Sequence, residues 1–280
     1  MPHALSFRAL FVVATLVPGC AELPGPLALA EPGVRAGADS GGDGGADVPA
    51  EADPEPILPL FVMTHPSGGK AVIQELVNTD GVVRQTFAIP AGISSPHGLA
   101  VDAARDRLLV GGFGEPGAAG IWAVDLRSGV ATPFHTRVQG EGIVVRGDRI
   151  FAVGEERFVD DLGLQHLPLA LHEFDVDGTL VGSRSLHGLP CALDLFELGD
   201  ALAYTCDGIV VRLDDDGRET FLTRAVADAD GDNFYAAVRF DDARTLFVSA
   251  SGAAFVFDGV RTVPGIPLAV GGWITAVAVP

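Results

Sequence analysis

The stretch PHGLAVDAARDRLLV, residues 96–110, decides the fold. It consists of an alternating apolar run, a short polar turn and a second apolar run, which is the pattern of a β-hairpin. Weaker copies recur at 142–154 (GIVVRGDRIFAVG), 192–206 (ALDLFELGDALAYTC) and 236–251 (AAVRFDDARTLFVSAS), and a half-copy (WITAVAVP) ends the chain at 273–280. Hairpin repeats about every 40 to 50 residues predict a β-propeller.

A second hairpin in each repeat supports the same fold. Its turn places Asp, Asn or Ser near a Gly, the choice that tight turns favour because φ becomes positive there. Five such turns occur, at 78–81, 126–129, 176–178, 214–217 and 257–259. The number of turns therefore predicts five blades.

The inner strands of the blades are expected at 99–102, 143–146, 192–196, 236–240 and 274–279. The first repeat offers only three outer strands, at 60–66, 71–77 and 82–89, and lacks an inner one. We expect the C-terminal strand to complete this blade, which closes the ring and leaves no exposed sheet edge. The prediction is an all-β propeller of five blades with roughly 45 residues each; four or six blades are the alternatives.

The charge of the chain excludes one class of partner. It has 18 basic and 37 acidic residues, a formal net charge of −19. No basic patch is present in the sequence to neutralise phosphates, so nucleic acid is not an expected partner. After the first 20 residues no apolar run reaches the length of about 18 that a membrane-spanning helix needs.

The N-terminus predicts export. Arg8 is followed by the apolar run 9–17, and the segment ends in Leu-Val-Pro-Gly-Cys at 16–20, which resembles a bacterial lipobox. That resemblance implies a lipoprotein signal peptide at 1–20 and an acylated Cys20 anchored in the lipid bilayer. Ala21 after the cysteine suggests the outer membrane of a Gram-negative bacterium, facing the periplasm or the cell surface. An ordinary cleaved secretory leader is the alternative.

Residues 21–56 form an acidic segment rich in Gly, Pro and Ala that contains no aromatic residue. Such a composition cannot bury enough apolar surface to fold, so we expect a disordered tether. The propeller domain then covers residues 57–280.

Two cysteines flank the first hairpin of the fourth blade. If 198–199 is a two-residue turn, Cys191 and Cys206 lie opposite each other, because facing positions then sum to the same number. A hydrogen-bonded pair places the two Cα atoms about 5.5 Å apart, within disulfide range. An exported compartment permits the bond; two free thiols are the alternative.

One mouth of the channel is the predicted functional face, because the inner strands run in parallel and the residues before them meet there. These residues are His97, Gln139, Glu141, His187, Asp230, Asp232, Asn233, Tyr235 and Trp273. Loops on the same face add His65, Phe113, Glu115, Glu155, Glu156 and Asp207. Acids and imidazoles that converge in one concavity indicate a site, and crowded acids raise one another's pKa. The alternative is that these loops are simply polar.

Alternate carboxylates at 228–233 (DADGDN) resemble a calcium loop, since hard cations prefer oxygen ligands. The helix-loop-helix form does not fit, because Gly231 is not at the sixth position and Arg239 stands where a bidentate Glu is needed. A solvated acidic loop is the alternative.

The middle of the chain resembles the glutamine cyclotransferase (glutaminyl cyclase) family. The similarity lies in GLAVD at 98–102, IWAVDLRSGV at 121–130 and GEGIVVRGDRIF at 140–151. It implies a five-bladed propeller in which Glu141, in its Gly-Glu-Gly setting, is the catalytic acid or base at the central pocket.

The same region is also similar to gluconolactonase-like propellers, which have six blades. This resemblance implies a central divalent cation, such as calcium, held by Glu141, Asp232 and Asn233, that would polarise a lactone carbonyl.

The primary functional hypothesis is a non-catalytic binding or scaffold module of the cell envelope that presents His97, Glu141, His187, Asp232, Asn233, Tyr235 and Trp273 to a peptide, glycan or envelope protein. This choice rests on Pro96-His97-Gly98, which stands where the cyclotransferases have Thr-Gln-Gly. The alternative is an enzyme, either a glutaminyl cyclase-like acyltransferase or a lactonase, for which Glu141 would be indispensable.

Overall fold

The computed structural model describes residues 59–280 except 67–68, 78–79, 115–119, 161–162, 190, 207–208, 225–233, 240–243, 258–261 and 266. The predicted leader, Cys20 and the tether therefore lie outside the described residues. Residues 51–280 form one compact unit. Its only described helical segment is the single 3₁₀ turn Ala103–Arg105, so no helix within the described residues is long and apolar enough to cross a membrane.

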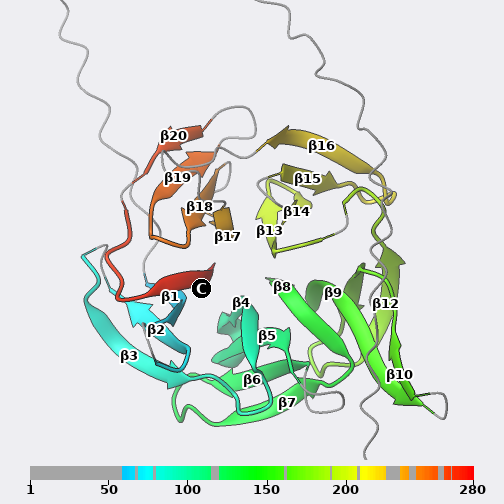
Figure 1. Cartoon of the computed structure of the whole chain (residues 1–280), viewed down its shortest axis with the longest axis horizontal. Coiled ribbons are helices and arrows are strands. Elements are labelled where there is room, and N and C mark those ends of the chain that lie inside the picture. Colours follow the sequence, from blue (N-terminus) through cyan, green and yellow to red (C-terminus); the bar gives the residue numbers. More distant parts are fainter. Residues whose placement is uncertain are drawn as a thin grey trace, which may run out of the picture. The chain divides into compact units, whose positions relative to one another are not determined.

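Five antiparallel sheets are arranged in a ring (Figure 1), so the prediction of a five-bladed propeller is confirmed. Their inner strands line a central cavity, and we call the space along the axis of the ring the channel. Blade 1 contains, from the channel outward, β21 (Trp273–Ala278), β1 (Leu60–His65), β2 (Val72–Leu76) and β3 (Val83–Ala88). Blade 2 contains β4 (Ser95–Asp102), β5 (Arg107–Phe113), β6 (Ile121–Asp125) and β7 (Ala131–His135).

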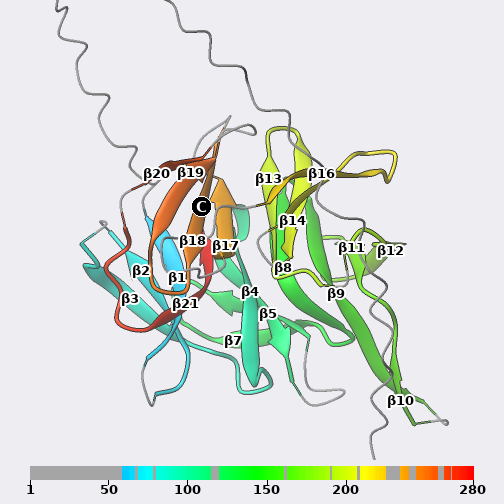
Figure 2. The same cartoon turned by 45° about the horizontal axis from the view of Figure 1, so that its top comes forward.

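The remaining blades follow in chain order. Blade 3 contains β8 (Val138–Arg146), β9 (Arg149–Asp160), β11 (Ala170–Phe174) and β12 (Leu180–Ser185), with β10 (Gly163–His166) paired to the far end of β9. Blade 4 contains β13 (Asp194–Leu198), β14 (Ala201–Cys206), β15 (Ile209–Leu213) and β16 (Glu219–Arg224). Blade 5 contains β17 (Phe234–Arg239), β18 (Thr245–Ser249), β19 (Ala254–Phe257) and β20 (Thr262–Pro264). The hairpin of β9 and β10, which the sequence patterns did not predict, extends beyond its blade (Figure 2).

The ring closes as expected, because the last strand pairs with the first. β21 is antiparallel to β1, with Met63 opposite Ala276 and His65 opposite Trp273. The C-terminal strand thus becomes the inner strand of blade 1, and β1 has a partner on both sides.

Apolar side chains between neighbouring sheets hold the blades together. Leu108, Leu109 and Val110 are all fully buried, because both faces of β5 are covered by adjacent blades. Between blades 4 and 5, Phe247 contacts Phe196 at 5.4 Å and Phe257 at 5.8 Å between ring centroids. Covered faces explain why the second strands read as continuous apolar runs.

The second hairpins turn as predicted. Gly81, Gly129, Gly178 and Gly217 all have φ between 71° and 91°, so four of the five expected turns need a residue that tolerates positive φ. The fifth turn, at 257–259, is partly outside the described residues.

Residues toward the C-terminal ends of all five inner strands line one cavity. The inner strands therefore run in parallel. We call the end of the channel where these strands begin the N-terminal mouth and the end where they finish the C-terminal mouth. β4 and β8 begin earlier than expected, so His97, Gln139 and Glu141 lie within strands rather than in the loops before them.

The cysteines form a disulfide, Cys191–Cys206, with 5.4 Å between Cα atoms. The turn that led to this prediction was wrong by one residue. Leu198 faces Ala201, so the turn is Gly199–Asp200, and Gly199 takes a φ of 59°. Cys191 therefore precedes β13, and the loop before that strand, rather than a directly opposed strand pair, brings it to Cys206.

Candidate functional site

The N-terminal mouth is built by a local irregularity that recurs in the inner strands. In β4, Pro96 faces Gly112 and Gly98 faces Gly111, so His97 is an extra residue without a cross-strand partner. Glu141 holds the same position in β8, and the backbone of Tyr235 holds it in β17. These are β-bulges, which turn a side chain away from the ladder and are frequent beside functional sites.

The residue after each bulge is small because the blades approach closely there. A Cβ atom on Gly142 would lie 2.0 Å from the backbone nitrogen of Leu195, and one on Gly98 would lie 2.7 Å from the carbonyl oxygen of Gly140. Only glycine fits at these contacts. The pairs His97-Gly98 and Glu141-Gly142 therefore combine a chemically active side chain with a close junction between blades.

Burial strongly perturbs the carboxyl group of Glu141 at this mouth. Burial raises its pKa from the ordinary value of 4.5 to about 7, and the carboxylate of Glu155 adds to the increase, while Arg157 opposes it. At neutral pH a large fraction of Glu141 is therefore protonated, so the group can both donate and accept a proton.

His97 is half-buried and neutral at pH 7. Its Nε2 lies 2.9 Å from the Oγ atom of Ser95, and its ring meets Phe113 edge-on at 5.5 Å between centroids. Burial lowers the pKa of His97, and His65 lowers it further. A neutral imidazole of this kind can donate or accept a hydrogen bond.

Arg157 connects the two bulges. Its guanidinium lies 3.2 Å from Glu155, the acid beside Glu141, and 5.1 Å from the ring centroid of Phe113, which contacts His97. A cation over an aromatic face is an attractive contact. Glu141 and His97 thus belong to one continuous cluster that spans blades 2 and 3, with Arg157 at its centre.

Trp273 also lies at this mouth. It is the first residue of β21, lies opposite His65, and keeps 72% of its surface exposed. In blade 3, Gln139 of β8 is buried, and its Oε1 has no hydrogen-bond partner among the described residues. An exposed indole is a stacking surface, and a buried unpartnered carbonyl is costly unless something donates to it.

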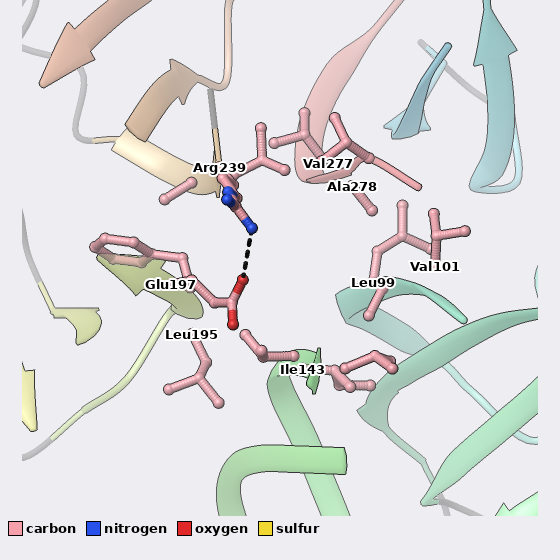
Figure 3. Close-up of a pocket in the computed structure, with 15 residues that line it drawn as sticks. Leu99, Val101, Ile143, Leu195, Glu197, Arg239, Val277 and Ala278 are labelled. Carbon is pink, nitrogen blue, oxygen red and sulfur yellow. Dashed lines mark ion pairs between the residues drawn. The ribbon is translucent and has the colours of Figure 1, made fainter. Parts of the chain in front are cut away.

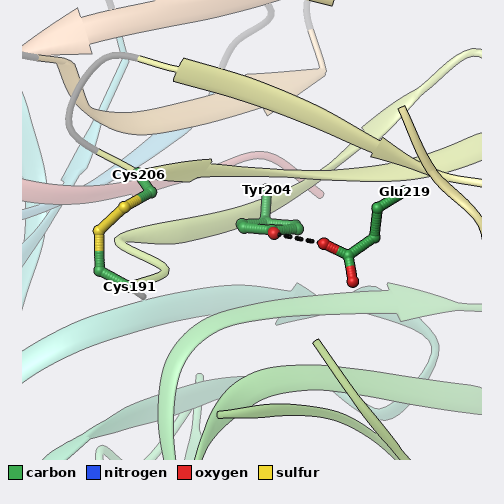
Figure 4. The surroundings of a disulfide bond; sticks show 4 residues. All are labelled: Cys191, Tyr204, Cys206 and Glu219. Carbon is green, nitrogen blue, oxygen red and sulfur yellow. Dashed lines mark hydrogen bonds between the residues drawn. A yellow bond between two sulfur atoms is a disulfide. The ribbon is translucent and has the colours of Figure 1, made fainter. Parts of the chain in front are cut away.

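His187 belongs to a different cluster. It is exposed, and its backbone N–H donates to Oε1 of Glu219 at 2.8 Å. The other oxygen of Glu219 accepts from Gly188 N–H at 2.7 Å and from the Tyr204 hydroxyl at 2.9 Å. Burial alone would raise the pKa of Glu219, but these donors lower it overall. Figure 4 shows the hydrogen bond between Tyr204 and Glu219 together with the Cys191–Cys206 disulfide. Glu219 and the disulfide therefore both stabilise the loop before β13.

Several predicted residues cannot be placed. Glu115, Asp207, Asp230, Asp232 and Asn233, with the calcium-like segment 228–233, lie outside the described residues, as does the side chain of Tyr235. Within the described ranges, no three His, Cys, Asp or Glu side chains are grouped so that they could hold a metal ion. The predicted set of Glu141, Asp232 and Asn233 is therefore left as an expectation.

The C-terminal half of the channel is apolar and ends in charge. A small cavity of about 80 Å³ is lined by side chains such as Leu99, Ile143 and Leu195 (Figure 3). At its opening, Glu197 lies 2.8 Å from Arg146 and 3.8 Å from Arg239. Each of these three residues stands at or near the end of an inner strand.

Sequence reasoning missed Arg157 and this second charged cluster. Arg157 directly follows Glu155 and Glu156, which the loop argument did identify, so its neighbourhood was a usable signal. Arg146 and Arg239 each follow an apolar run. A charged residue in that place is typical of an ordinary strand end exposed to solvent, so the pattern did not indicate a cluster.

Comparison with known proteins gives no matching family model and no matching curated protein. Among solved structures, the chain is similar to the WD40 domain of Pan2 from Neurospora crassa, with a TM-score of 0.40 and 12% identity. The match covers 74% of this chain and 59% of the other, so it spans about three-fifths of the length of that domain.

Proposed function

We propose that this chain is an exported, lipid-anchored propeller that binds a polar ligand, a peptide or a glycan, at its N-terminal mouth without altering it. The observation that carries the proposal is the recurring bulge, which places His97 and Glu141 at one opening of the channel. Trp273, 72% exposed, supplies an aromatic surface at the same opening.

The chemistry of the mouth fits a ligand rich in hydrogen-bonding groups. A neutral imidazole at His97 and a carboxyl at Glu141 that is partly protonated at pH 7 can each donate or accept. Glycans and peptide backbones offer alternating donors and acceptors, and they also stack or pack against indole rings. The lipobox-like segment ending at Cys20 supports attachment to a membrane.

An acid–base enzyme is the second candidate, and one observation favours it. A carboxyl group with a pKa of about 7 is suited to proton transfer at neutral pH. A glutaminyl cyclase-like or lactonase-like reaction at this mouth would use Glu141 as the proton-transferring group.

The two tryptophans allow a direct binding test. Trp273 lies at the N-terminal mouth, whereas Trp122 lies in β6, an outer strand of blade 2. In residues 21–280 carrying Trp122→Phe, fluorescence reports Trp273 alone. We expect soluble cell-wall fragments, other oligosaccharides or short peptides to shift this emission at micromolar to millimolar concentration, in the range of about −4 to −8 kcal/mol.

Two controls separate the candidates. Trp273→Phe keeps only the Trp122 signal and should respond to none of these ligands. Mass spectrometry of the ligand after incubation should show no change for a binding module. Loss of ammonia from a glutaminyl peptide, or opening of a lactone ring, that disappears with Glu141→Gln would replace the binding proposal with the enzyme. No emission change with any ligand would count against a site at this mouth.

A further inference from the structure

A groove opens on the opposite side of the propeller, between blades 3 and 4 at the C-terminal mouth. Its volume is about 420 Å³, within the range of about 300–1,000 Å³ typical of ligand sites. Its floor is apolar and consists of Phe151 and Leu171 from blade 3 and Leu202 and Leu213 from blade 4. A Cβ atom on Gly182, at its edge, would meet nothing within 4 Å, so the space there is open.

Two arginines line this groove with unused hydrogen-bonding capacity. Arg146 donates through Nε to Glu197 at 2.8 Å and through Nη1 to the Asp200 carbonyl at 3.1 Å. Arg184 donates through Nη1 to the Asp214 carbonyl at 3.2 Å. Arg146 Nη2 and Arg184 Nε are buried and have no partner among the described residues. A buried donor without an acceptor costs about 1–3 kcal/mol, so rotation of either guanidinium toward an acceptor supplied by a ligand in the groove would be favourable.

The rim of the groove is acidic. The turn between β15 and β16 contributes Asp214 and Asp215 to the lining, and Asp216 follows them. Asp214 is paired with Arg212 at 3.1 Å, and Glu173 in the wall is paired with Arg149 at 3.3 Å. Asp215 and Asp216 are exposed. Three acids and two arginines line the groove. Arg218 stands near the rim as well, so the negative charge that favours a positively charged group is local to the exposed Asp215 and Asp216.

We propose that the groove between blades 3 and 4 binds an extended protein segment that carries apolar side chains and a basic residue at one end. Its apolar side chains would cover the floor, its neutral backbone carbonyls would accept from Arg146 and Arg184, and its basic residue would lie against Asp215 and Asp216. A neutral carbonyl suits the two guanidinium groups because it adds no negative charge beside the acidic rim. This site is separate from the N-terminal mouth.

The groove continues toward the channel, which suits an extended ligand. Arg146 also lines a neighbouring pocket with Glu197, Asp200 and Arg239. Asp200 lines a third pocket with three further aspartates and two arginines: Asp214, Asp215, Asp216, Arg212 and Arg218. An extended chain adds about 3.3 Å per residue, so a short segment of several residues could follow this surface.

The test uses fluorescence anisotropy with residues 21–280 and a labelled six-residue peptide that alternates leucine with alanine and ends in two arginines. Two matched peptides replace the leucines with serine or the arginines with glutamate. We expect the first peptide to bind and both matched peptides to bind at least about tenfold more weakly, from loss of apolar burial or of charge complementarity.

Variants locate the binding. Arg184→Leu should weaken the first peptide about tenfold, and Asp215→Lys should weaken it and strengthen the glutamate peptide. Arg84→Leu, which removes an arginine paired with Glu75 at 2.8 Å on blade 1, is the matched control and should leave binding unchanged. Urea midpoints of all variants check folding.

Three results would overturn the proposal: no binding at about 1 mM peptide, equal binding of the leucine and serine peptides, or affinity unaffected by both Arg184→Leu and Asp215→Lys. A response of Trp273 in the Trp122→Phe chain would place the peptide at the N-terminal mouth instead. Failure of ligands at the N-terminal mouth leaves this test unaffected, so the two proposals can fail separately.

Discussion

The two mouths of the channel place a glutamate in opposite electrostatic environments. At the N-terminal mouth, Glu141 is crowded by Glu155 and desolvated, so burial raises its pKa to about 7. At the C-terminal mouth, Glu197 lies between Arg146 and Arg239 and is compensated. An ionised carboxylate is therefore destabilising at Glu141, at the N-terminal mouth, and stabilising at Glu197, at the C-terminal mouth. A carboxylate whose charge costs stability, such as Glu141, indicates function better than a carboxylate that is paired with arginines, such as Glu197.

The junction between blades at the N-terminal mouth should be the most sensitive point. Gly142→Ala places a methyl group 2.0 Å from the backbone of Leu195, so we expect a loss of about 3–5 kcal/mol or failure to fold. The matched control is Gly182→Ala, also in a strand, where the added atom meets nothing within 4 Å. Urea denaturation measures both, and similar midpoints would show that the blades can separate at this contact.

Removal of the disulfide should come next in size. Cys191 and Cys206 close a loop with a sequence separation of 15, for which chain entropy predicts about 3 kcal/mol. We expect the double variant Cys191→Ser, Cys206→Ser to lower the unfolding free energy by this amount, and a reducing agent to affect the wild-type chain but not the variant. Two titratable thiols in the unreduced wild-type chain would contradict the bond.

Glu141 should make stability fall as pH rises. Its pKa is about 7 in the folded chain against 4.5 ordinarily, so between these values the folded state holds a proton that the unfolded state releases. The loss should reach about 2 kcal/mol above pH 7, less than the full difference in proton affinity implies, because Glu141 keeps some contact with water. Glu141→Gln should be unchanged near pH 4 and more stable than wild type at pH 8.

The neighbour Glu155 provides a check on this pH effect. Glu155→Gln removes the second cause of the raised pKa, so the fall in stability should still begin near the ordinary pKa of 4.5 but end at a lower pH and be smaller, because Glu141 in the folded chain then ionises more easily. Parallel pH profiles for the wild type and Glu141→Gln would remove Glu141 as the cause.

The C-terminal mouth should give the smallest effect and the opposite sign. Glu197→Gln breaks the contacts with Arg146 and Arg239, and we expect a loss of about 1 kcal/mol at pH 8, decreasing at high salt because the arginines are partly exposed. At the same pH, Glu141→Gln should gain stability. If both variants changed stability in the same direction, the contrast between the mouths would be wrong.

The hairpin pattern was enough to predict the blades, because alternating apolar runs separated by turns such as Asp106 and Gly129 depend on local sequence. The bulges were not predictable. Whether His97 is paired or extra depends on the spacing of β5 opposite it, and that is a property of two strands. The disulfide was predicted from a turn that was wrong by one residue, since two cysteines near the open end of a hairpin can meet in more than one register. Arg146 and Arg239 acquire a partner only when blades distant in sequence meet.

The pairing of β1 with β21 has a kinetic consequence. Thr275 donates a hydrogen bond to the Met63 carbonyl across 212 residues, so a chain being synthesised cannot complete blade 1 until β21 is available. Until then one edge of β1 lacks its partner strand, and such edges promote aggregation. A chain that ends early would keep this edge open and remain accessible to proteases. The ring closure therefore acts as a test for the presence of β21, which only chains that contain this strand pass.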